Sequence, residues 1–400
     1  MRVLVLNSGS SSIKYRLFDM PAGTSLAGGL IERIGEARGR LEHRSRGGEI
    51  ERDLRVPGHA EGFALLLELL EGEGAPAAIG HRVVHGGDRF RAAALIDPGV
   101  REAIRTRIHL APLHNAANLT GIDAALAACP GVPQVAVFDT AFHQTMPPRA
   151  WRYAIPDAWY LRHAVRRYGF HGTSHGYVAR EAAGFLARDP GSLSLVVLHL
   201  GNGASATAVQ GGRSVDTSMG LTPLEGLVMG TRSGDLDPAV HAYLARRARL
   251  SPDEVDTALN EASGLKGLCG ENDMREVERR AADGDERAEL ALDVFCYRAR
   301  KYVGAYAAAM GALDALVFTA GIGENSATVR RRICAGLGVL GLSLDEARNA
   351  APGPLPAAVH AADSRVAALV IATDEELEIA RETAACLENA SPTPLSPQPS

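Results

Sequence analysis

Apolar residues near the start of this chain follow a strand-like pattern that a short polar turn interrupts. Residues 4–14 read LVLNSGSSSIK, and a related pattern, LVVLHLGNGASATAV, returns at residues 195–209. In each case an apolar run enters a tight turn of Gly, Ser and Asn, and the chain leaves in a second strand-like stretch. The pattern predicts two β-hairpins, with Asn7 and Asn202 in like positions.

Further along, short apolar runs alternate with stretches of helical spacing. Strands are predicted at 78–84, 134–138 and 367–373, and a strand-turn-helix unit at 315–333. Helices are predicted over residues 58–70, 252–260, 286–310 and 374–387. This alternation favours an α/β fold whose ligands lie at the carboxyl ends of its strands. The 400 residues exceed one core, and the Pro-containing segment 145–156 is the expected crossing between two domains.

Both predicted turns are suited to an anion. Glycine lets backbone N–H groups approach a phosphate closely, and the hydroxyls and amides add further donors. One such hairpin is more often only a turn. Two of them suggest similar lobes that face one another across a phosphate, as in a two-lobed phosphotransferase. A Walker A loop is excluded because the chain contains no Gly-Lys dipeptide.

The composition is that of an ordinary globular protein. Hydrophobic residues make up 46% and charged residues 22%, and a net charge of −5 gives no basic surface for nucleic acid or an anionic membrane. No apolar run reaches the roughly 18 residues of a membrane span, and the N-terminal run is too short for a signal peptide. The five cysteines are scattered, which favours reduced thiols. We therefore expect a soluble, cytoplasmic protein.

Two arginines stand next to glycine-rich turns. Arg82 lies in GHRVVHGGDRF and Arg232 in MGTRSGDLDP, one in each predicted lobe. Guanidinium groups match phosphate and carboxylate oxygens with two parallel donors and keep their charge. The alternative for any single arginine is a solvated surface charge, but the surrounding glycines favour close approach of a ligand.

The histidines of FHGTSH, His171 and His175, are spaced four apart, which on a helix could ligate zinc. Gly172 favours a turn instead, so a histidine that donates a hydrogen bond to a transferring phosphoryl group is the preferred interpretation. For His175, His114 and His143, a buried structural histidine remains an alternative.

Acidic residues follow two predicted strands. Asp139 ends the strand 134–138, and Glu375 stands near the start of the last helix. They either cap helices or help to hold Mg²⁺, which takes one or two carboxylates plus waters and phosphate oxygens. GIGEN, residues 321–325, follows an apolar strand as an incomplete dinucleotide fingerprint and could offer its backbone to adenine or ribose.

Taken together, these motifs closely resemble those of the acetokinase family, within the actin-like, sugar kinase and Hsp70 superfamily. The resemblance runs from about residue 3 to 387 and comprises nine motifs in the family's order. They are LVLNSGSSSIK, GHRVVHGG, LAPLHN, VFDTAFHQTMPP, YGFHGTSH, HLGNG, TPLEGLVMGTRSG, FTAGIGEN and TDEEL.

The resemblance implies a two-lobed actin-like ATPase fold with a duplicated ribonuclease H-like βββαβαβα core. The implied lobes are 1–148 plus 376–400, on the acyl and phosphoryl side with a disordered tail after about 389, and 149–375, which binds nucleotide and forms the dimer interface. It implies reversible in-line phosphoryl transfer from ATP to acetate, giving acetyl phosphate and ADP. Mg²⁺ would be required, with Mn²⁺ as a possible substitute, and the enzyme would be a homodimer without nucleic-acid or membrane partners.

The resemblance also implies site residues, carried over motif by motif. Catalysis would use Arg82, Asp139, His171 and Arg232. The acyl substrate would contact Arg82, Val84, Leu113, His114, Phe170 and Pro223. ATP would contact Lys14, His199, Leu200, Gly201, Asn202, Gly203, Asp273, Met274, Arg275, Gly321, Ile322, Gly323, Glu324 and Asn325. The metal would bind Asn7 and Glu375. Met274 departs from the family pattern, in which an aromatic residue often stands at this position.

Three other functions remain as alternatives. Within the family, a propionate or butyrate kinase differs by as little as one methylene of the acceptor, which is weak discrimination. An ATP-driven, actin-like or chaperone-like binding protein would close its lobes without an acceptor. A zinc hydrolase is the third.

Overall fold

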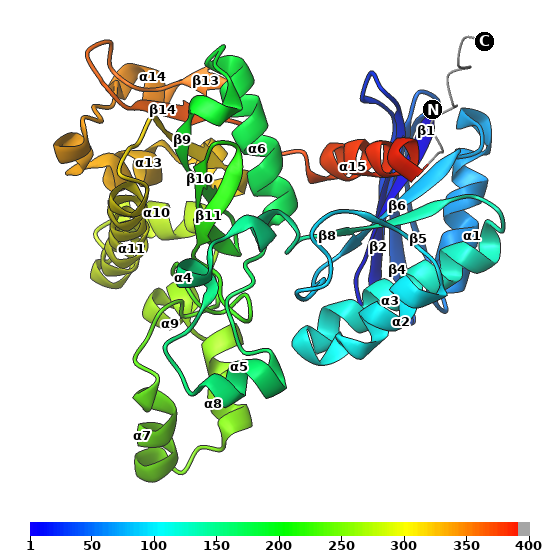
Figure 1. The fold of residues 1–400 in the computed structure, drawn as a ribbon, viewed down its shortest axis with the longest axis horizontal. Helices are drawn as coiled ribbons and strands as arrows, with labels where there is room; N and C mark the ends of the chain where they lie inside the picture. Colours follow the sequence, from blue (N-terminus) through cyan, green and yellow to red (C-terminus); the bar gives the residue numbers. More distant parts are fainter. Residues whose placement is uncertain (391–400) are drawn as a thin grey trace, which may run out of the picture. The chain divides into compact units, whose positions relative to one another are not determined.

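The computed structural model describes residues 1–390, except for the side chains of residues 112 and 113. The chain forms two compact units. Unit 1 comprises Met1–Ala141 and the chain from Asp374 onward, and unit 2 comprises Phe142–Thr373. Each unit contains one β-sheet with helices packed against it (Figure 1). Across residues 1–390, no helix combines the length and the apolar character that a bilayer crossing needs.

The sheet of unit 1 has eight strands in the order β5-β4-β3-β2-β1-β6-β8-β7. β1 pairs antiparallel with β2 and parallel with β6, and β6 pairs parallel with β8. The strands are β1 (Arg2–Ser8), β2 (Ser12–Asp19), β3 (Thr24–Glu32), β4 (Gly39–Ser45), β5 (Gly48–Leu54), β6 (Ala78–Val83), β7 (Ala94–Leu95) and β8 (Gln134–Phe138). The α-helices are α1 (His59–Leu70), α2 (Pro98–Thr106), α3 (Pro112–Ala128) and α15 (Glu375–Ala390).

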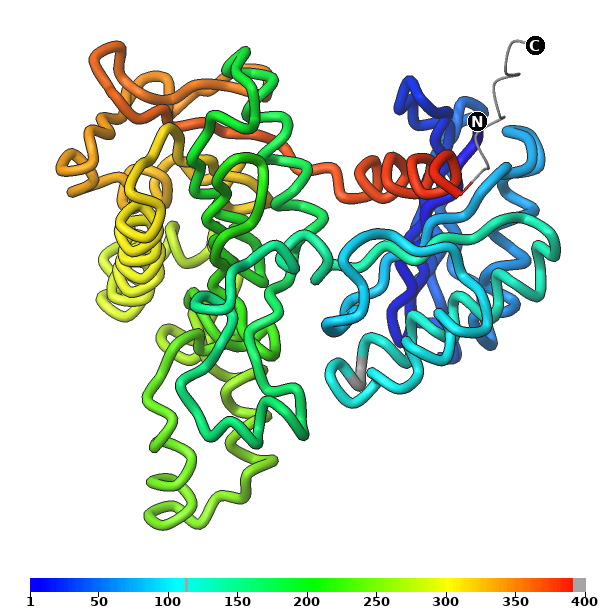
Figure 2. The backbone as a smooth tube through the Cα atoms, viewed as in Figure 1, coloured from blue at the N-terminus to red at the C-terminus, as the bar shows by residue number. Residues whose placement is uncertain are grey.

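Alternation along β1 explains why helices cover both faces of this sheet. Leu4 and Leu6 belong to one core together with Phe63 of α1, whereas Val3 and Val5 belong to a second core that includes residues of α15. Successive side chains of a strand point to opposite faces. Figure 2 shows α15, in red, beside the blue N-terminal strands of unit 1, and its main contacts are with β1, β6 and β8. A strand buried on both faces reads as a continuous apolar run, as VLVL does.

The sheet of unit 2 has six strands in the order β11-β10-β9-β12-β14-β13, with β9 antiparallel to β10 and parallel to β12. The strands are β9 (Ser194–Leu200), β10 (Ala204–Gln210), β11 (Arg213–Thr217), β12 (Ala315–Thr319), β13 (Ala357–Ala358) and β14 (Ala367–Val370). The α-helices are α4 (Pro148–Trp151), α5 (Asp157–His163), α6 (Gly172–Phe185), α7 (Ala239–Ala248), α8 (Pro252–Glu261), α9 (Gly264–Cys269), α10 (Met274–Ala282), α11 (Glu286–Met310), α12 (Ala320–Asn325), α13 (Ala327–Cys334) and α14 (Glu346–Ala350).

The two sheets share one arrangement. The order β3-β2-β1-β6-β8 in unit 1 corresponds to β11-β10-β9-β12-β14 in unit 2. In each, a three-stranded antiparallel meander is followed by two parallel strands. This repetition confirms the predicted α/β class with a duplicated core.

The breaks between the units differ from the predicted lobe limits of 148/149 and 375/376. The 3₁₀ turn Phe142–Thr145 already belongs to unit 2, because Nδ1 of His143 lies 2.9 Å from the buried Ser214 hydroxyl on β11. Unit 1 resumes at Asp374, whose carboxylate pairs with Arg16 of β2 at 3.0 Å. Side-chain partners of this kind cannot be read from the proline pattern.

Most predicted elements are confirmed, and the strand 134–138 and the helix 286–310 have the predicted bounds. The predicted turn at GIGEN is wrong in detail, because these residues form the short helix α12 directly after β12. The predicted disorder of the tail falls mainly on residues 391–400, which lie outside the described residues.

The two hairpins are confirmed, but Asn7 and Asn202 do not occupy like positions. Asn7 lies inside the ladder of β1 and β2, whereas Asn202 lies in the loop beyond the last pair of the second ladder, Leu200 with Ala204. The residue that takes the ladder position of Asn7 is His199. The two turns differ in length, so matching them by their asparagines shifted the comparison.

Candidate active site

Arg82 forms the centre of a polar cluster at the strand ends of unit 1. Its guanidinium makes a two-point contact with Asp139, with Nη2 at 2.5 Å from Oδ2 and Nε at 3.2 Å from Oδ1. Nη1 lies 3.4 Å from Oδ1 of Asn7, and Nε lies 3.9 Å from Oε2 of Glu375. Burial alone would lower the pKa of Arg82, but Asp139 and Glu375 outweigh it and raise the pKa. The structure thus brings together four predicted site residues from β1, β6, the end of β8 and α15.

Two asparagines of α3 hold the strand ends that carry this cluster. Asn118 accepts a hydrogen bond from Val84 N at 3.0 Å and donates to Ser8 O at 2.8 Å, so one side chain joins the ends of β1 and β6. Asn115 makes the same two kinds of bond to the backbone of His85, at 3.0 and 2.9 Å. Neither asparagine was predicted, although Asn115 belongs to the LAPLHN motif. Their spacing of three residues on a helix was the available signal.

The oxygens beside Arg82 fit a divalent cation. Burial raises the pKa of Glu375 to about 7, with the charges of Asp139 and Glu376 adding to the rise and that of Arg82 opposing it. Asn7 adds an amide oxygen to the same cluster. Mg²⁺ binds proteins through one or two such oxygens and completes its shell with water and phosphate oxygens. The residues present therefore suit Mg²⁺.

The remaining predicted residues of unit 1 lie on β2, directly after β6 and on α3. Lys14 of β2 forms an ion pair with Glu376 of α15. Val84 is 6% exposed directly after β6. His114 is exposed at the first turn of α3, so a buried structural role is wrong for it. The side chain of Leu113 is outside the described residues.

In unit 2, His171 and Arg232 meet at the turn of the second hairpin. A Cβ placed on Gly203 would lie 3.6 Å from Nε2 of His171 and 3.5 Å from Nη1 of Arg232. His171 immediately precedes α6 in the left-handed conformation, with φ of +55°, which is uncommon for a residue other than glycine. Such a conformation often marks a functional site. The structure therefore places an imidazole and a guanidinium beside one glycine-rich turn.

Arg232 is held by neutral groups. Nη1 lies 3.4 Å from Pro223 O and 3.8 Å from Sδ of Met229. Burial lowers the pKa of Arg232. Its turn is fixed to the hairpin because Gly230 N donates to Asn202 O at 2.9 Å, and a Cβ on Gly230 would come within 2.0 Å of Asn202 Oδ1. A side chain at position 230 would therefore displace the Asn202 amide.

His199 supports His171 from the end of β9. The two rings stack with centroids 4.2 Å apart and planes inclined by 27°. Nδ1 of His199 lies 2.8 Å from Oγ of Ser174, which in turn lies 2.8 Å from Oγ1 of Thr373. The ring against which His171 stacks is thus itself fixed in place.

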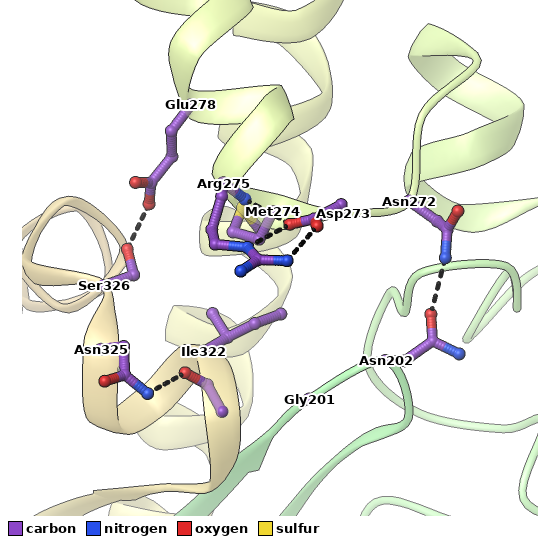
Figure 3. Close-up of a pocket in the computed structure, with 11 residues that line it drawn as sticks. Gly201, Asn202, Asn272, Asp273, Met274, Arg275, Glu278, Ile322, Asn325 and Ser326 are labelled. Atoms are coloured by element: carbon purple, nitrogen blue, oxygen red, sulfur yellow. Dashed lines mark hydrogen bonds and ion pairs between the residues drawn. The ribbon is translucent and has the colours of Figure 1, made fainter. Parts of the chain in front are cut away.

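A pocket of about 700 Å³ opens beside the hairpin of unit 2 (Figure 3). At one end Asn272 donates to Asn202 at 3.2 Å, and at the opposite end Ser326 donates to Glu278. Met274 and Ile322 add apolar surface between these ends. The lining residues are Gly201, Asn202, Asn272, Asp273, Met274, Arg275, Glu278, Gly321, Ile322, Asn325 and Ser326. Two predicted ATP segments, 273–275 and 321–325, therefore contribute to one pocket next to the Gly/Asn turn.

Not every predicted ATP residue faces this pocket. Glu324 accepts hydrogen bonds from Ala320 N at 2.8 Å and Thr373 N at 3.2 Å, so its carboxylate serves the start of α12. Gly323 is buried, and its carbonyl accepts from Arg330 at 2.9 Å. Neither residue lines the pocket, because α12 turns them inward where a loop would have exposed them. Arg330, which was not predicted, is 1% exposed and also bonds Glu324 O at 2.9 Å.

The arrangement of the described histidines is not that of a zinc site. Among residues 1–390, no three His, Cys, Asp or Glu side chains gather as a metal-binding group. The predicted turn at Gly172 is wrong, since α6 begins there. His143 and His175 are both fully buried, and Nε2 of His143 donates to Phe170 O at 2.9 Å. A buried structural position is confirmed for these two.

The fold and the site together define a class of protein. Two units with the same core strand order each have an arginine beside their first hairpin, and unit 2 has a large pocket next to its hairpin turn. This is the architecture of an actin-like phosphotransferase, a kinase.

The chain belongs to the acetokinase family, whose model matches residues 2–381. It is 57% identical over 397 residues to an acetate kinase from Streptomyces avermitilis, covering 97% of this chain and 98% of the relative. The crystal structure of Porphyromonas gingivalis acetate kinase is similar with a TM-score of 0.92 and 42% identity, over 96% of this chain and 99% of that one. A propionate kinase from Francisella tularensis is similar with a TM-score of 0.91 and 45% identity, with the same coverage.

Proposed function

We propose that this protein transfers a phosphoryl group reversibly between ATP and acetate, giving acetyl phosphate and ADP. Membership of the acetokinase family supports the reaction class, and the curated relatives named acetate kinase support the acceptor. The structural observation that carries the proposal is that His171 Nε2 and Arg232 Nη1 both lie close to Gly203. Two donors at one glycine-rich turn suit the oxygens of a phosphoryl group during its transfer.

Acetate needs no general base, because its carboxyl group is already ionised at neutral pH. The chemical task is to bring one anion up to another and to stabilise the charge that spreads over the transferring group. Arg82 would orient the acyl carboxylate and the phosphoryl group, while Arg232 and His171 would bind the phosphoryl oxygens. The two-point contact of Asp139 with Arg82 supports an orienting role for this carboxylate.

Nucleotide binding would use the pocket of unit 2. The base would lie between Met274 and Ile322, and the phosphates would run toward Gly201 and Asn202, which line the same pocket. The apolar middle and the polar ends of the pocket support this orientation. Lys14 is proposed as a further contact of ATP.

Asn7 and Glu375 would hold Mg²⁺, with Mn²⁺ as a possible substitute. When bound, the metal neutralises negative charge on the phosphates. The protein's contribution is the arrangement of these two oxygens beside Arg82, which the contacts of 3.4 and 3.9 Å support.

The acyl pocket is proposed to comprise Val84, Leu113, His114, Phe170 and Pro223. Val84 belongs to unit 1, and Phe170 and Pro223 belong to unit 2. The similarity to a propionate kinase keeps that acceptor as the second candidate. Rates with acetate, propionate and butyrate distinguish the two.

We propose further that the enzyme is a cytoplasmic homodimer that uses no nucleic-acid or membrane partner. Large apolar side chains exposed on unit 2, Trp159 at 53%, Leu161 at 71% and Tyr243 at 57%, support a subunit interface on this unit. The molar mass in solution, measured by light scattering, tests the dimer.

The function itself is tested by trapping acetyl phosphate as its hydroxamate. Purified protein with ATP, acetate and Mg²⁺ should form hydroxamate, and omission of acetate or of Mg²⁺ should abolish it. ATP hydrolysis that proceeds without acetate and forms no acyl phosphate would favour the ATP-driven binding protein instead.

A further inference from the structure

Three side chains of unit 2 share a single hydroxyl proton. Nδ1 of His171 lies 2.9 Å from Oγ of Ser205, and Nε2 of His175 lies 2.8 Å from the same oxygen. Ser205 and His175 are both 0% exposed. Because Ser205 has one hydroxyl proton, it can donate to only one of the two rings and must accept from the other.

Two proton arrangements satisfy this constraint. In the first, His175 carries its proton on Nε2 and donates it to Ser205, whose hydroxyl donates to Nδ1 of His171. In the second, Nδ1 of His171 donates to Ser205, whose hydroxyl donates to Nε2 of His175, so that His175 carries its proton on Nδ1. The two arrangements leave opposite nitrogens of His171 protonated.

The surroundings of His175 favour the first arrangement. Nδ1 of His175 is buried and has no hydrogen-bond partner. The second arrangement would leave an N–H donor unsatisfied there, and a buried donor without a partner is destabilising. His175 also lies in the first turn of α6, where the positive end of the helix dipole favours a lone pair over a proton.

Both arrangements are written for a neutral His175, and its environment favours that form. Burial, with His143 and His199 nearby, lowers the pKa of His175 well below the ordinary value. Neutral imidazole has one donor and one acceptor nitrogen, as the shared-proton chain needs.

We propose that Ser205 and His175 are positioning residues that fix the ring proton of His171 on Nε2. Stacking on His199 fixes the plane of the ring, and the hydroxyl of Ser205 fixes which nitrogen carries the proton. The protonated nitrogen is the one that lies beside Gly203 together with Arg232. A neutral His171 can then donate to a phosphoryl oxygen without first taking up a proton. This consequence rests on the proposed function, whereas the tautomer itself does not.

The tautomer is directly measurable in the wild-type enzyme. Imidazole ¹⁵N shifts of histidine-labelled protein at pH 7.5, with His171 assigned through His171→Gln, distinguish Nε2–H from Nδ1–H. The proposal expects Nε2–H at His171 and at His175. An Nδ1–H signal at His171 would overturn it, whether or not the protein phosphorylates acetate.

Variants test the relay through activity. In Ser205→Ala the His171 signals should move toward a mixture of tautomers, and kcat should fall about tenfold, the order expected for one lost hydrogen bond. The KM for ATP should stay within about twofold, since His171 acts on the transferring group alone. The matched control is Thr207→Ala, which removes another buried hydroxyl from β10. That hydroxyl bonds Thr217 at 2.9 Å and contacts no described histidine.

Two substitutions at position 175 separate positioning from packing. Glutamine places its amide N–H₂ near the position of Nε2, and asparagine places it near that of Nδ1. His175→Gln should therefore keep kcat within about threefold, while His175→Asn should lose about tenfold. Equal losses in both variants, with an unchanged His171 spectrum in Ser205→Ala, would show that these residues only fill space. If a variant does not fold, the wild-type spectrum still decides.

Discussion

The two arginines that are proposed to act in catalysis differ in the groups that contact them. Arg82 in unit 1 is paired with Asp139 at 2.5 Å and lies near Glu375. Arg232 in unit 2 contacts a carbonyl and a thioether, and no described carboxylate lies within ion-pair distance of it. A partly buried cation without a partner is costly, so its charge is best explained by an anionic ligand. Arg232 should therefore bind the transferring group most directly. Arg82 is instead held in place by carboxylates of the protein itself.

The largest expected effect follows from the unpartnered arginine. Arg232→Ala should lower kcat by about 10³-fold or more, as does loss of a phosphoryl-stabilising arginine. The hydroxamate assay measures it, and Arg213→Ala, an exposed arginine on β11 of the same unit, is the control. A near-normal rate in Arg232→Ala would remove this residue from the mechanism.

A smaller loss of activity is expected when the carboxylate that pairs with Arg82 is changed. Asp139→Asn should lower kcat by about 10–100-fold, because it weakens a charge-assisted contact that orients Arg82 while retaining one acceptor. Asp123→Asn is the matched control, since it breaks a half-exposed pair with Arg101 at 2.6 Å. A general base would instead be indispensable. Complete loss of activity in a folded Asp139→Asn protein would contradict the orienting role.

The pocket of unit 2 should govern nucleotide affinity alone. Ile322→Ala removes apolar contact with the base and should raise the KM for ATP by about tenfold. The KM for acetate should not change. Val339→Ala, at a residue that is 87% exposed and does not line the pocket, should leave both values unchanged. An effect on acetate equal to that on ATP would mean that the pocket has been assigned to the wrong substrate.

The smallest effect concerns the acceptor. Val84→Ala should improve propionate relative to acetate by about 1 kcal/mol, or about fivefold in the ratio of kcat/KM, because a methylene discriminates weakly. The ratio is its own control, since a loss of stability affects both acceptors alike. An unchanged ratio would show that Val84 does not contact the acyl group.

The sequence supported the regular elements better than it supported side-chain roles. The bounds of helix α11 were predicted correctly from its periodicity. The structure shows that Asp285 caps its start and that Gly311 ends it in the left-handed conformation. The family's motifs predicted Arg82, Asp139 and Arg232 as site residues, and the structure pairs the first two. Motif spacing could not give the register of the hairpins, so Asn202 was compared with Asn7 although His199 takes that position.

Residues that act through others were the ones missed. Asn118 joins β1 to β6, and Ser205 links two histidines, but each is an ordinary polar residue in the sequence. Their roles depend on partners at least 30 positions away, which only the folded chain brings near. Glu324 illustrates the converse, since it lies within a nucleotide motif but caps α12.

The central claim is that Arg82 and Arg232 act on the same phosphoryl group, and a double-mutant cycle tests it most directly. The kcat of Arg82→Ala, Arg232→Ala and the double variant should be compared with that of the wild-type enzyme. Groups that act as a unit show losses far from multiplicative. The account predicts that the double variant is little slower than the slower single variant. If the two losses multiply in full, the arginines act independently and the shared site is contradicted.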